Sequence, residues 1–316
     1  MSKNQHFTDY IFYSMNLVEE KIDISKLEKI DITHKPLIES LLTYNNSTSC
    51  ENCFANLYLW RDFYGLEILP LGNSAVIYAR KNGFIYFPIG KILPPSALAN
   101  IVDTFTDANL FGDVRRIYNV PPEYPINFPD AEKFFEFSAS HSEFDYVYDV
   151  DKQINLTGAK LRKKRNHIKR FFLQNPNWHT EKIDSKNISV AVDFMISEDN
   201  KKQLYFEESV IANVKKDFDA LDLTGVLLYS DLETISAAAI IGKISNQTYA
   251  VHFEKSNKQV EGASQAIVKL EAEQIKHLGG KFMNREQDLG NENLRRAKES
   301  LDPDFLYMRL GATPKF

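Results

Sequence analysis

The stretch that decides the fold is residues 248–290, which read TYAVHFEKSNKQVEGASQAIVKLEAEQIKHLGGKFMNREQDLG. Residues 248–254 are apolar and aromatic enough for a buried strand, and residues 262–278 have the spacing of an amphipathic helix. Residues 280–284 predict a second strand. Polar and charged side chains follow each strand directly. The stretch therefore predicts a strand–helix–strand unit with a polar edge.

The rest of the second half extends this unit. A basic helix, a strand, two helices and two further strands are predicted before it, and one helix after it. Their ranges are 158–174, 178–183, 190–197, 201–218, 225–230, 234–244 and 292–300.

The first half shows a similar order of elements. Strands are predicted at 22–30, 66–71, 75–80, 83–88 and 115–120, and helices at 35–45, 51–64 and 95–106. Ser47 and Ser49 are the expected N-caps of the helix over 51–64. We therefore expect an α+β protein of two tandem domains, 1–145 and 146–316, each with a mixed, mostly antiparallel sheet flanked by helices. This order of elements resembles that of the GNAT acyltransferases, in which an acyl group is transferred.

Composition indicates a globular protein without a membrane span. Apolar residues make up 43% and charged residues 26%, and no apolar run reaches about 18 residues. The N-terminus lacks the pattern of a secretory signal, so we expect a cytoplasmic location. Residues 1–145 hold 12 Lys+Arg against 19 Asp+Glu, and residues 146–316 hold 26 against 24. A mildly positive second half is suited to an anionic ligand.

The two cysteines, Cys50 and Cys53, are spaced as C-x-x-C. A zinc site would need a second pair of ligands, and a thioredoxin-like site would need a strand before the motif within a βαβ unit. The histidines lack the spacing of a metal site, and no serine stands in a G-x-S-x-G setting. We therefore expect no metal and no covalent nucleophile.

The strongest local feature is the basic stretch 160–170, in which seven of eleven residues are Lys or Arg. On a helix, Arg165 falls on the apolar stripe, so we expect it to face inward and to pair with a carboxylate or a phosphate. Lys163, Lys164 and the neighbouring Asn166 are candidates for binding an anionic donor, such as tRNA, a nucleotide or an acidic lipid. The alternative is a solvated helix face that balances the acidic first half.

A second candidate is the loop from Gln259 to Ser264, which joins a predicted strand to a predicted helix. Backbone N–H groups at a helix start can bind a pyrophosphate, and Gly262 would permit close approach. The spacing is similar to the loop that binds coenzyme A in GNAT enzymes, with Ser264 where Gly or Ala is usual. The alternative is an ordinary tight turn that needs glycine.

The ends of the two strands carry the candidates for chemistry. In a GNAT fold these strands separate, and a carboxylate in the gap can accept a proton from an attacking amine or hydroxyl. The candidate general bases are Glu254, Glu286 and Asp288. The candidate substrate-binding residues around them are His252, Lys255, Asn284, Arg285, Arg295 and Lys298. The alternative is a structural network of ion pairs around Arg285 and Arg295.

These segments together resemble a known family. They are FANLYLW at 54–60, KKRNH at 163–167, HFEK at 252–255, NREQDLG at 284–290 and LRRAK at 294–298. The chain is similar to bacterial proteins of unknown function grouped with the C-terminal domain of phosphatidylglycerol lysyltransferase, and its basic helix resembles that of the Fem aminoacyltransferases. Two departures are the missing multi-span membrane region and the sequence KESLDP at 298–303, where close relatives usually have a tyrosine.

The resemblance implies two tandem GNAT folds and the transfer of an acyl or aminoacyl group, with aminoacyl-tRNA as the expected donor. Implied partners are tRNA and, at the periphery, an anionic lipid. Two alternatives stay open: a non-catalytic anion- or nucleotide-binding protein with this fold, and a coenzyme A-dependent N-acetyltransferase. The sequence defines no oligomeric state and no acceptor.

Overall fold

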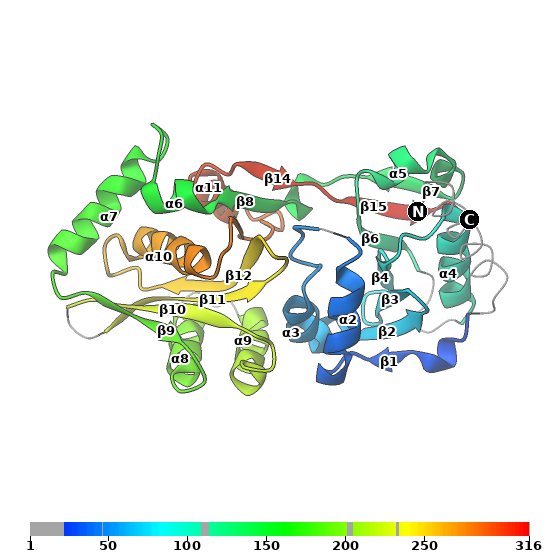
Figure 1. Ribbon diagram of the computed structural model, residues 1–316, viewed down its shortest axis with the longest axis horizontal. Helices are drawn as coiled ribbons and strands as arrows, with labels where there is room; N and C mark the ends of the chain where they lie inside the picture. The colour runs from blue at the N-terminus through cyan, green and yellow to red at the C-terminus, as the bar shows by residue number, and fades with distance from the viewer. Residues whose placement is uncertain (1–21, 46, 109–113, 201–204, 232–233, 316) are drawn as a thin grey trace, which may run out of the picture. The chain divides into compact units, whose positions relative to one another are not determined.

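The computed structural model describes residues 22–45, 47–108, 114–200, 205–231 and 234–315 (Figure 1). The chain forms two compact units. The first consists of Met1–Asn46, Trp60–Ser140 and Met308–Phe316, and the second of Ser47–Leu59 and His141–Tyr307. These units are discontinuous in sequence, whereas the expected domains 1–145 and 146–316 are continuous.

The first unit contains an eight-stranded sheet in the order β1-β2-β3-β4-β6-β15-β7, with β5 paired to β3. Its strands are β1 (Glu28–Lys29), β2 (Leu66–Leu71), β3 (Ser74–Ala79), β4 (Phe84–Tyr86), β5 (Ile89–Gly90), β6 (Arg116–Val120), β7 (Phe135–Ser138) and β15 (Leu310–Pro314). Its α-helices are α2 (Lys35–Leu42), α4 (Pro95–Asp107) and α5 (Tyr124–Asn127), and its 3-10 helices are η1 (Ile24–Lys26), η2 (Ile32–His34) and η3 (Pro129–Lys133).

The apolar face of α4 forms the core of this unit. Leu98, Val102 and Phe105 recur at helical spacing, are buried, and pack against strand residues that include Tyr78. The rings of Tyr78 and Phe105 meet edge-on, with centroids 5.2 Å apart. Burial of these side chains is the main source of stability for the unit.

The second unit contains a seven-stranded sheet in the order β14-β8-β13-β12-β11-β10-β9. Its strands are β8 (Asp145–Asp149), β9 (His179–Ile183), β10 (Thr224–Tyr229), β11 (Ile235–Lys243), β12 (Thr248–Ser256), β13 (Phe282–Asn284) and β14 (Phe305–Tyr307). Its helices are η4 (His141–Glu143), α6 (Val150–Asn155), α7 (Arg162–Gln174), α8 (Ile188–Asn200), α9 (Tyr205–Asp217), α10 (Ala263–His277), α11 (Glu292–Glu299) and the first part of α3 (Phe54–Tyr64).

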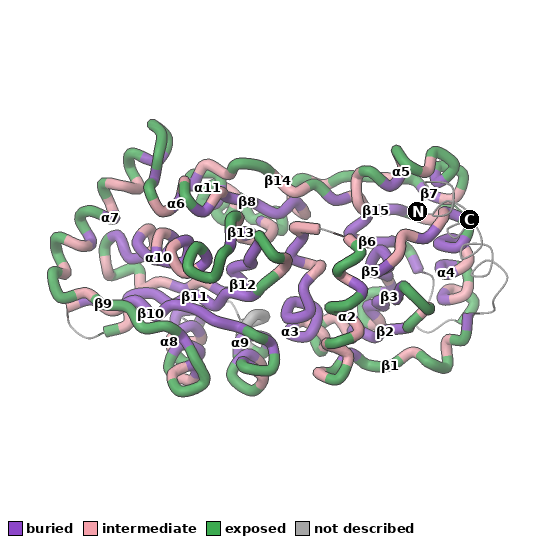
Figure 2. Tube along the Cα trace, viewed as in Figure 1, coloured by how far each residue is buried: buried purple, intermediate pink, exposed green. Residues whose placement is uncertain are grey.

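Helices cover both faces of the second sheet. α10 packs on one face, against β10 to β13, and α8 packs on the other, against β11 and β12 (Figure 1). The central strands and α10 are largely buried, while most of the outer side of α7 is exposed (Figure 2). The predicted fold class, two mixed and mostly antiparallel sheets flanked by helices, is thus confirmed.

Several predicted boundaries differ from the structure. Of the strand expected at 22–30, only the two residues of β1 form a strand. The 3-10 helix η1 lies before β1 and η2 directly after the expected range, because Asp23 and Asp31 accept N–H groups two residues on and hold the backbone in turns. α3 begins at Phe54 rather than 51, because Ser49 Oγ accepts the N–H of Glu51 in a preceding turn. Residues 201–204 of the expected helix 201–218 lie outside the described residues.

Candidate active site

A gap opens in the second sheet between β12 and β13. These parallel strands pair from Thr248, opposite Phe282, to Ala250, opposite Asn284, and the pairing ends there. β12 continues along β11, while β13 stays paired with β8. The residues that follow Ala250 and Asn284 therefore lie on two diverging edges, as expected for a GNAT-like fold.

His252 is the extra residue of a β-bulge on the first of these edges. Ile240 on β11 faces Phe253, whereas Ile241 faces Val251, so His252 has no opposite residue. A bulge redirects the side chain that it carries, and such bulges are common beside active sites. The bulge therefore sets the direction of the imidazole.

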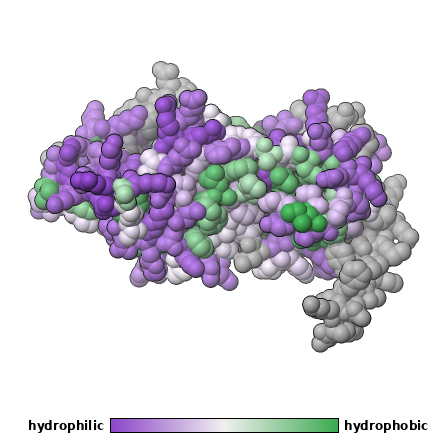
Figure 3. Space-filling view, turned by 90° about the horizontal axis from the view of Figure 1, so that it is seen from above, coloured by the Kyte–Doolittle hydropathy of each residue, from purple (hydrophilic) through white to green (hydrophobic). Residues whose placement is uncertain are grey.

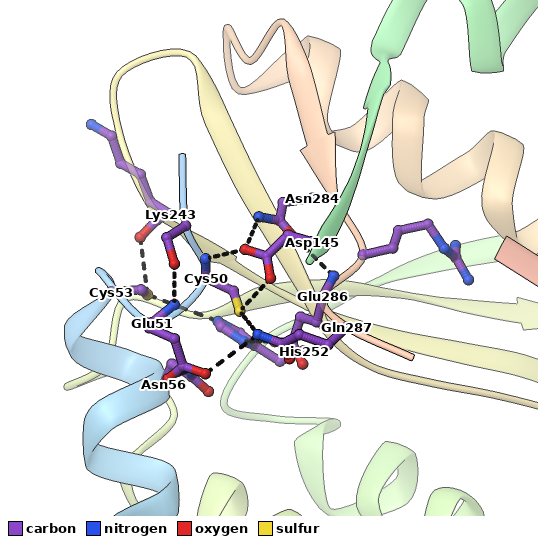
Figure 4. A network of polar contacts seen from close by, with 12 residues as sticks. Cys50, Glu51, Cys53, Asn56, Asp145, Lys243, His252, Asn284, Glu286 and Gln287 are labelled. Atoms are coloured by element: carbon purple, nitrogen blue, oxygen red, sulfur yellow. Dashed lines mark hydrogen bonds and ion pairs between the residues drawn. The ribbon is translucent and has the colours of Figure 1, made fainter. Parts of the chain in front are cut away.

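The imidazole of His252 is held by groups from three segments (Figure 4). Its Nδ1 lies 3.0 Å from Oε1 of Glu286, and its Nε2 lies 4.0 Å from Sγ of Cys53. Gly242 leaves room for the ring, since a Cβ there would lie 2.4 Å from Nε2. The side chain of His252 is 2% exposed and that of Glu286 is 21% exposed. Glu286 is therefore the accessible end of the pair.

Burial lowers the pKa of His252, but its contacts with Cys53 and Glu286 outweigh burial and raise the pKa to about 10. A protonated imidazole beside the Glu286 carboxylate is thus the stable form at neutral pH. Glu286 itself has a positive φ of 58°, which is uncommon for a residue with a side chain, and its N–H donates to Asn284 Oδ1 at 2.7 Å. The structure keeps this backbone conformation through that hydrogen bond.

The segment around Cys50 is joined by polar contacts to Asp145 and to the residues that end β13 and follow it (Figure 4). The N–H of Cys50 and the side-chain amide of Asn284 both donate to Oδ2 of Asp145, at 2.8 and 2.9 Å. Asn284 also donates to the carbonyl of Thr48 at 2.7 Å, and Gln287 Nε2 lies 3.1 Å from Cys50 Sγ. Asn284 therefore ties the end of β13 to this segment, which is a positioning role.

Arg285 holds two carboxylates behind the gap. Its Nη1 lies 2.7 Å from Glu254 Oε2 and 2.7 Å from Glu271 Oε2. Burial raises the pKa of Glu271, and the adjacent Glu254 raises it further, so Glu271 keeps a proton. Burial would also raise the pKa of Glu254, but Arg285 lowers it overall, so Glu254 is ionised. An ionised carboxylate paired with arginine is a poor proton acceptor.

Asp288 holds the loop between β13 and α11. It is fully buried and accepts hydrogen bonds from Tyr146 Oη at 2.8 Å, from the N–H of Gly290 at 2.8 Å, and from Arg295 Nε and Nη2 at 2.8 and 3.0 Å. The pKa of Asp288 is lowered, chiefly by Arg295. Because these hydrogen bonds occupy both carboxylate oxygens, Asp288 has a structural role. Arg295 is paired with Asp288 and does not face a ligand.

Lys298 is the one buried residue of α11. Its Nζ donates to the carbonyls of Arg285 and Gln287, on both sides of Glu286. Burial is the main reason that its pKa falls to about 8. Lys298 therefore holds the backbone on both sides of Glu286 in position.

The basic helix α7 has two half-buried cations, Lys164 and Arg165. Arg165 is half-buried, but its Nη1 donates to the carbonyls of Leu156 and Gly158, so its partner is neither a carboxylate nor a phosphate. Backbone carbonyls at the end of α6 need donors, which accounts for this contact. Lys163 and Asn166 are exposed. Lys164 is half-buried and near enough to Arg285 and Glu254 for their charges to shift its pKa.

The start of α10 is covered by α7. Gly262 is buried with a φ of 81°, and a Cβ on it would lie 2.5 Å from the carbonyl oxygen of His167 and 2.9 Å from Cβ of Phe171. The glycine is therefore needed for contact with a helix and not for approach to a pyrophosphate. Gln259 is exposed and Ser264 half-buried. This geometry does not favour a coenzyme A site at the loop.

Lys255 lies apart from the gap. Its Nζ is 2.7 Å from Asp199 on α8, which covers the other face of the sheet, and both side chains are buried. Neighbouring residues of a strand point to opposite faces, so Lys255 points away from Glu254. The structure thus gathers around the gap the residues His252, Glu254, Asn284, Arg285, Glu286 and Lys298.

Sequence reasoning missed the contributions of Cys50, Cys53, Asp145 and Glu271. The cysteines are distant in sequence from β12 and β13, and nothing in a C-x-x-C pair indicates a histidine partner two hundred residues away. A C-x-x-C directly before a helix was the one available signal.

Within the described residues, no group of His, Cys, Asp or Glu side chains could hold a metal ion. None of the described helices has both the length and the apolar character that crossing a bilayer requires.

Comparison with known proteins agrees with the fold. A conserved protein of unknown function from Bacteroides thetaiotaomicron is 25% identical, with a TM-score of 0.82 over 92% of this chain and 99% of that one. L-PGS from Bacillus licheniformis is 14% identical, with a TM-score of 0.63 over 91% and 93%. FemX is 10% identical, with a TM-score of 0.54 over 90% and 96%. The last two show the fold alone.

A search of curated protein sequences found no match. Residues 43–309, however, match the family described as phosphatidylglycerol lysyltransferase, C-terminal. That match spans most of the chain and includes both edges of the gap, the basic helix and α11. The predicted resemblance is confirmed, and the chain belongs to the phosphatidylglycerol lysyltransferase C-terminal family.

Proposed function

We propose that the chain transfers an aminoacyl group from aminoacyl-tRNA to an amine or hydroxyl acceptor, in the cytoplasm, where charged tRNA is found. The observation that carries the proposal is the pairing of His252 with Glu286 across the gap between β12 and β13. This is the edge at which a GNAT-like fold holds its reacting carbonyl. The family membership supports acyl transfer as the reaction class.

Glu286 is the proposed general base. It is the accessible member of the pair, and no cation other than the buried His252 is hydrogen-bonded or ion-paired to its carboxylate within the described residues. All three candidate carboxylates have a cationic partner, Arg285 for Glu254, Arg295 for Asp288 and His252 for Glu286, and Glu286 is the most exposed of them, which makes it the carboxylate best placed to take a proton from the acceptor. His252 then orients Glu286 and carries a compensating positive charge.

The outer side of α7 is the proposed contact for the donor. Arg162, Lys163 and Lys169 are exposed, and within the described residues they have no hydrogen-bonding or ionic partner. The surface of the second unit that Figure 3 shows is largely hydrophilic. Cations of this kind bind the phosphates of RNA through a salt-sensitive attraction. These contacts with phosphate would bind RNA without distinguishing its base sequence.

The test is transfer by the purified chain of labelled lysine from lysyl-tRNA to phosphatidylglycerol micelles or to hydroxylamine, a probe amine. We expect Glu286→Gln to lower the rate at least about 100-fold, which is typical for loss of a general base. Glu261→Gln, at an exposed carboxylate paired with Arg170, is the control and should keep the rate. Full activity of Glu286→Gln would exclude Glu286 as the base. Failure of the unaltered chain with a mixture of all aminoacyl-tRNAs would exclude aminoacyl transfer.

A second candidate function is binding of an anionic ligand without chemistry. The same exposed cations of α7 favour it. Here tRNA would bind with an affinity that falls steeply with salt, and no transfer would occur with any acceptor. The transfer assay and a salt titration of binding therefore separate the two functions.

A further inference from the structure

The thiol of Cys53 contacts the imidazole of His252 at the ring nitrogen that Glu286 does not use (Figure 4). Its Sγ lies 4.0 Å from Nε2, whereas Glu286 contacts Nδ1. The same sulfur donates to the carbonyl of Lys243 at 3.2 Å. A carbonyl oxygen can only accept, so the single thiol hydrogen lies in that contact. Toward Nε2 the sulfur is therefore an acceptor, and Nε2 carries a hydrogen.

The backbone around Cys53 and His252 fixes this contact. The carbonyl of Cys53 accepts the N–H of Leu57 at 3.1 Å, so the cysteine stands at the start of α3. On β11, a Cβ at Gly242 would lie 2.4 Å from Nε2 of His252. A side chain at Gly242 would therefore displace the ring. The approach of Nε2 to the sulfur thus depends on a glycine in one strand and on the start of a helix.

A cysteine, a histidine and a glutamate in contact in this order are also the groups of a cysteine nucleophile with its base and its orienting acid. The exposed fractions argue against that role. The side chain of Glu286 is 21% exposed, whereas the side chain of His252 and the residue Cys53 are each 2% exposed. A nucleophile has to meet the reacting carbonyl. The carboxylate is the end of this series that a substrate can reach, and the thiol is the interior end.

An acceptor at each ring nitrogen lets the buried imidazole hold two protons with no N–H unpaired. Burial lowers the pKa of His252, and the hydrogen bond to Cys53 is the first of the contacts that raise it, ahead of the one to Glu286. The imidazolium is a positive charge beside Glu286, and such a charge keeps a carboxylate ionised to lower pH. Lys298, which bonds the carbonyls on both sides of Glu286, is a second cation that acts on this carboxylate.

We propose that Cys53 is a positioning residue of the transfer: it accepts the Nε2–H of His252 and keeps the imidazole charged, so that Glu286 stays ionised and able to take the proton of the acceptor. Cys53 touches no reacting atom, and no bond to its sulfur forms or breaks. The acceptor's proton goes to Glu286 and is released to water after the transfer. This inference rests on the proposed function, in which Glu286 is the base, and adds the group that sets the pH range of that base.

The first test measures the charge of His252 in the absence of donor and acceptor. In the full chain with ¹⁵N-labelled histidine, the ring signals of His252 are assigned by their loss in His252→Gln and followed against pH. In Cys53→Ala the imidazolium should lose its proton at a pH lower by at least about 1 unit, because the acceptor at Nε2 is gone. Cys53→Ser keeps an acceptor and should titrate closer to the unaltered chain.

Two further variants control this titration. Cys50→Ala alters the other buried thiol of the same segment, whose sulfur contacts Asp145 and Gln287, and it should leave the titration of His252 unchanged. Cys53→Val fills the space without an acceptor and takes the place of Cys53→Ala where the alanine variant does not fold. An unchanged titration of His252 in Cys53→Ala or Cys53→Val would overturn the role of Cys53.

The second test is the pH dependence of transfer from lysyl-tRNA to phosphatidylglycerol micelles. In Cys53→Ala the midpoint of the acid limb of kcat should rise by about 1 pH unit, since Glu286 loses the adjacent charge. The plateau should fall by less than the roughly 100-fold that loss of a general base costs. Titration of the donor itself cancels, because both proteins use the same substrates.

The remaining outcomes of this assay are distinct. A lower rate at every pH with an unmoved midpoint would show that Cys53 acts through structure alone, and an aminoacyl thioester trapped on Cys53 would make it a nucleophile. Either result would overturn the positioning role. Absence of transfer by the unaltered chain would instead overturn the proposed function, and the ¹⁵N titration would then show on its own whether Cys53 sets the charge of His252.

Discussion

Nδ1 of His252 lies 3.0 Å from Oε1 of Glu286, and this contact joins the two edges of the gap between β12 and β13. The pair combines a buried imidazole with a partly exposed carboxylate. Its charges have consequences for stability as well as for chemistry, because the pKa of His252 is raised in the folded protein.

The first prediction concerns pH. The folded pKa of His252 is about 10 against an ordinary value of 6.5, so the folded state holds this proton more tightly than the unfolded state. The resulting stability is fully present below about pH 6.5 and is lost as pH rises toward about 10. Urea unfolding across this range should show a fall in the free energy of unfolding that is smaller in His252→Gln. His277→Gln, at an exposed histidine, should follow the unaltered chain.

The second prediction compares the two carboxylates on Arg285. Glu271 keeps its proton, so Glu271→Gln should change the free energy of unfolding by less than about 1 kcal/mol. Glu254→Gln removes the negative charge that balances buried Arg285 and should cost about 3 kcal/mol or more. Urea denaturation of both variants at neutral pH checks this. The reverse order of stability would mean that the proton is on Glu254.

The third prediction concerns Gly262. Gly262→Ala would bring a Cβ against His167 and Phe171, and it should destabilise by about 1–3 kcal/mol beyond the cost of a positive φ. Gly279→Ala is the control, since its φ of 84° is nearly the same and no atom lies within 4 Å of the added Cβ. Thermal melts measure the difference.

In the same melts, acetyl-coenzyme A should leave the Tm of the unaltered chain unchanged. A clear rise would return the loop at Gly262 to consideration as a ligand site.

The fourth prediction concerns Asp288. Asp288→Asn removes a carboxylate that is bound by Tyr146 and Arg295, at a cost of about 2 kcal/mol or more at neutral pH. The folded pKa of Asp288 is depressed, so its contribution is present above its ordinary value of 3.8 and is lost as pH falls below it. The variant should therefore lose less stability than the unaltered chain between neutral pH and pH 3. Glu292→Gln, at an exposed site, should show the ordinary acid profile.

Much of the fold could be predicted because its central elements follow simple periodicity. The order β10 to β13 with α10 was predicted closely, since these segments are apolar and bounded by turns. β8, β14 and β15 were not predicted. β14 has three residues, none of them buried, so its local sequence carries no strand pattern. Its strand character comes from pairing with β8.

The candidate site was harder to predict than the fold. Sequence placed Glu254, Glu286 and Asp288 together but could not rank them, because the difference lies in their partners Arg285, His252 and Arg295. The inward residue of α7 was placed at Arg165 by helical geometry. In the structure Arg165 reaches back along the chain to the carbonyls of Leu156 and Gly158 and pairs with no carboxylate among the described residues. A long side chain can turn away from the direction of its Cβ, which a helical projection does not represent.

The exchange of segments between the two units has a consequence for how this protein can evolve. The chain passes from one unit to the other after Asn46, Leu59, Ser140 and Tyr307. A gene cut near Ser140, between the two halves, could not yield two complete proteins: the downstream product would lack Cys53 beside His252, and the upstream product would lack β15 between β6 and β7. We therefore expect the halves to be inherited together, with neither available to recombination as a separate module.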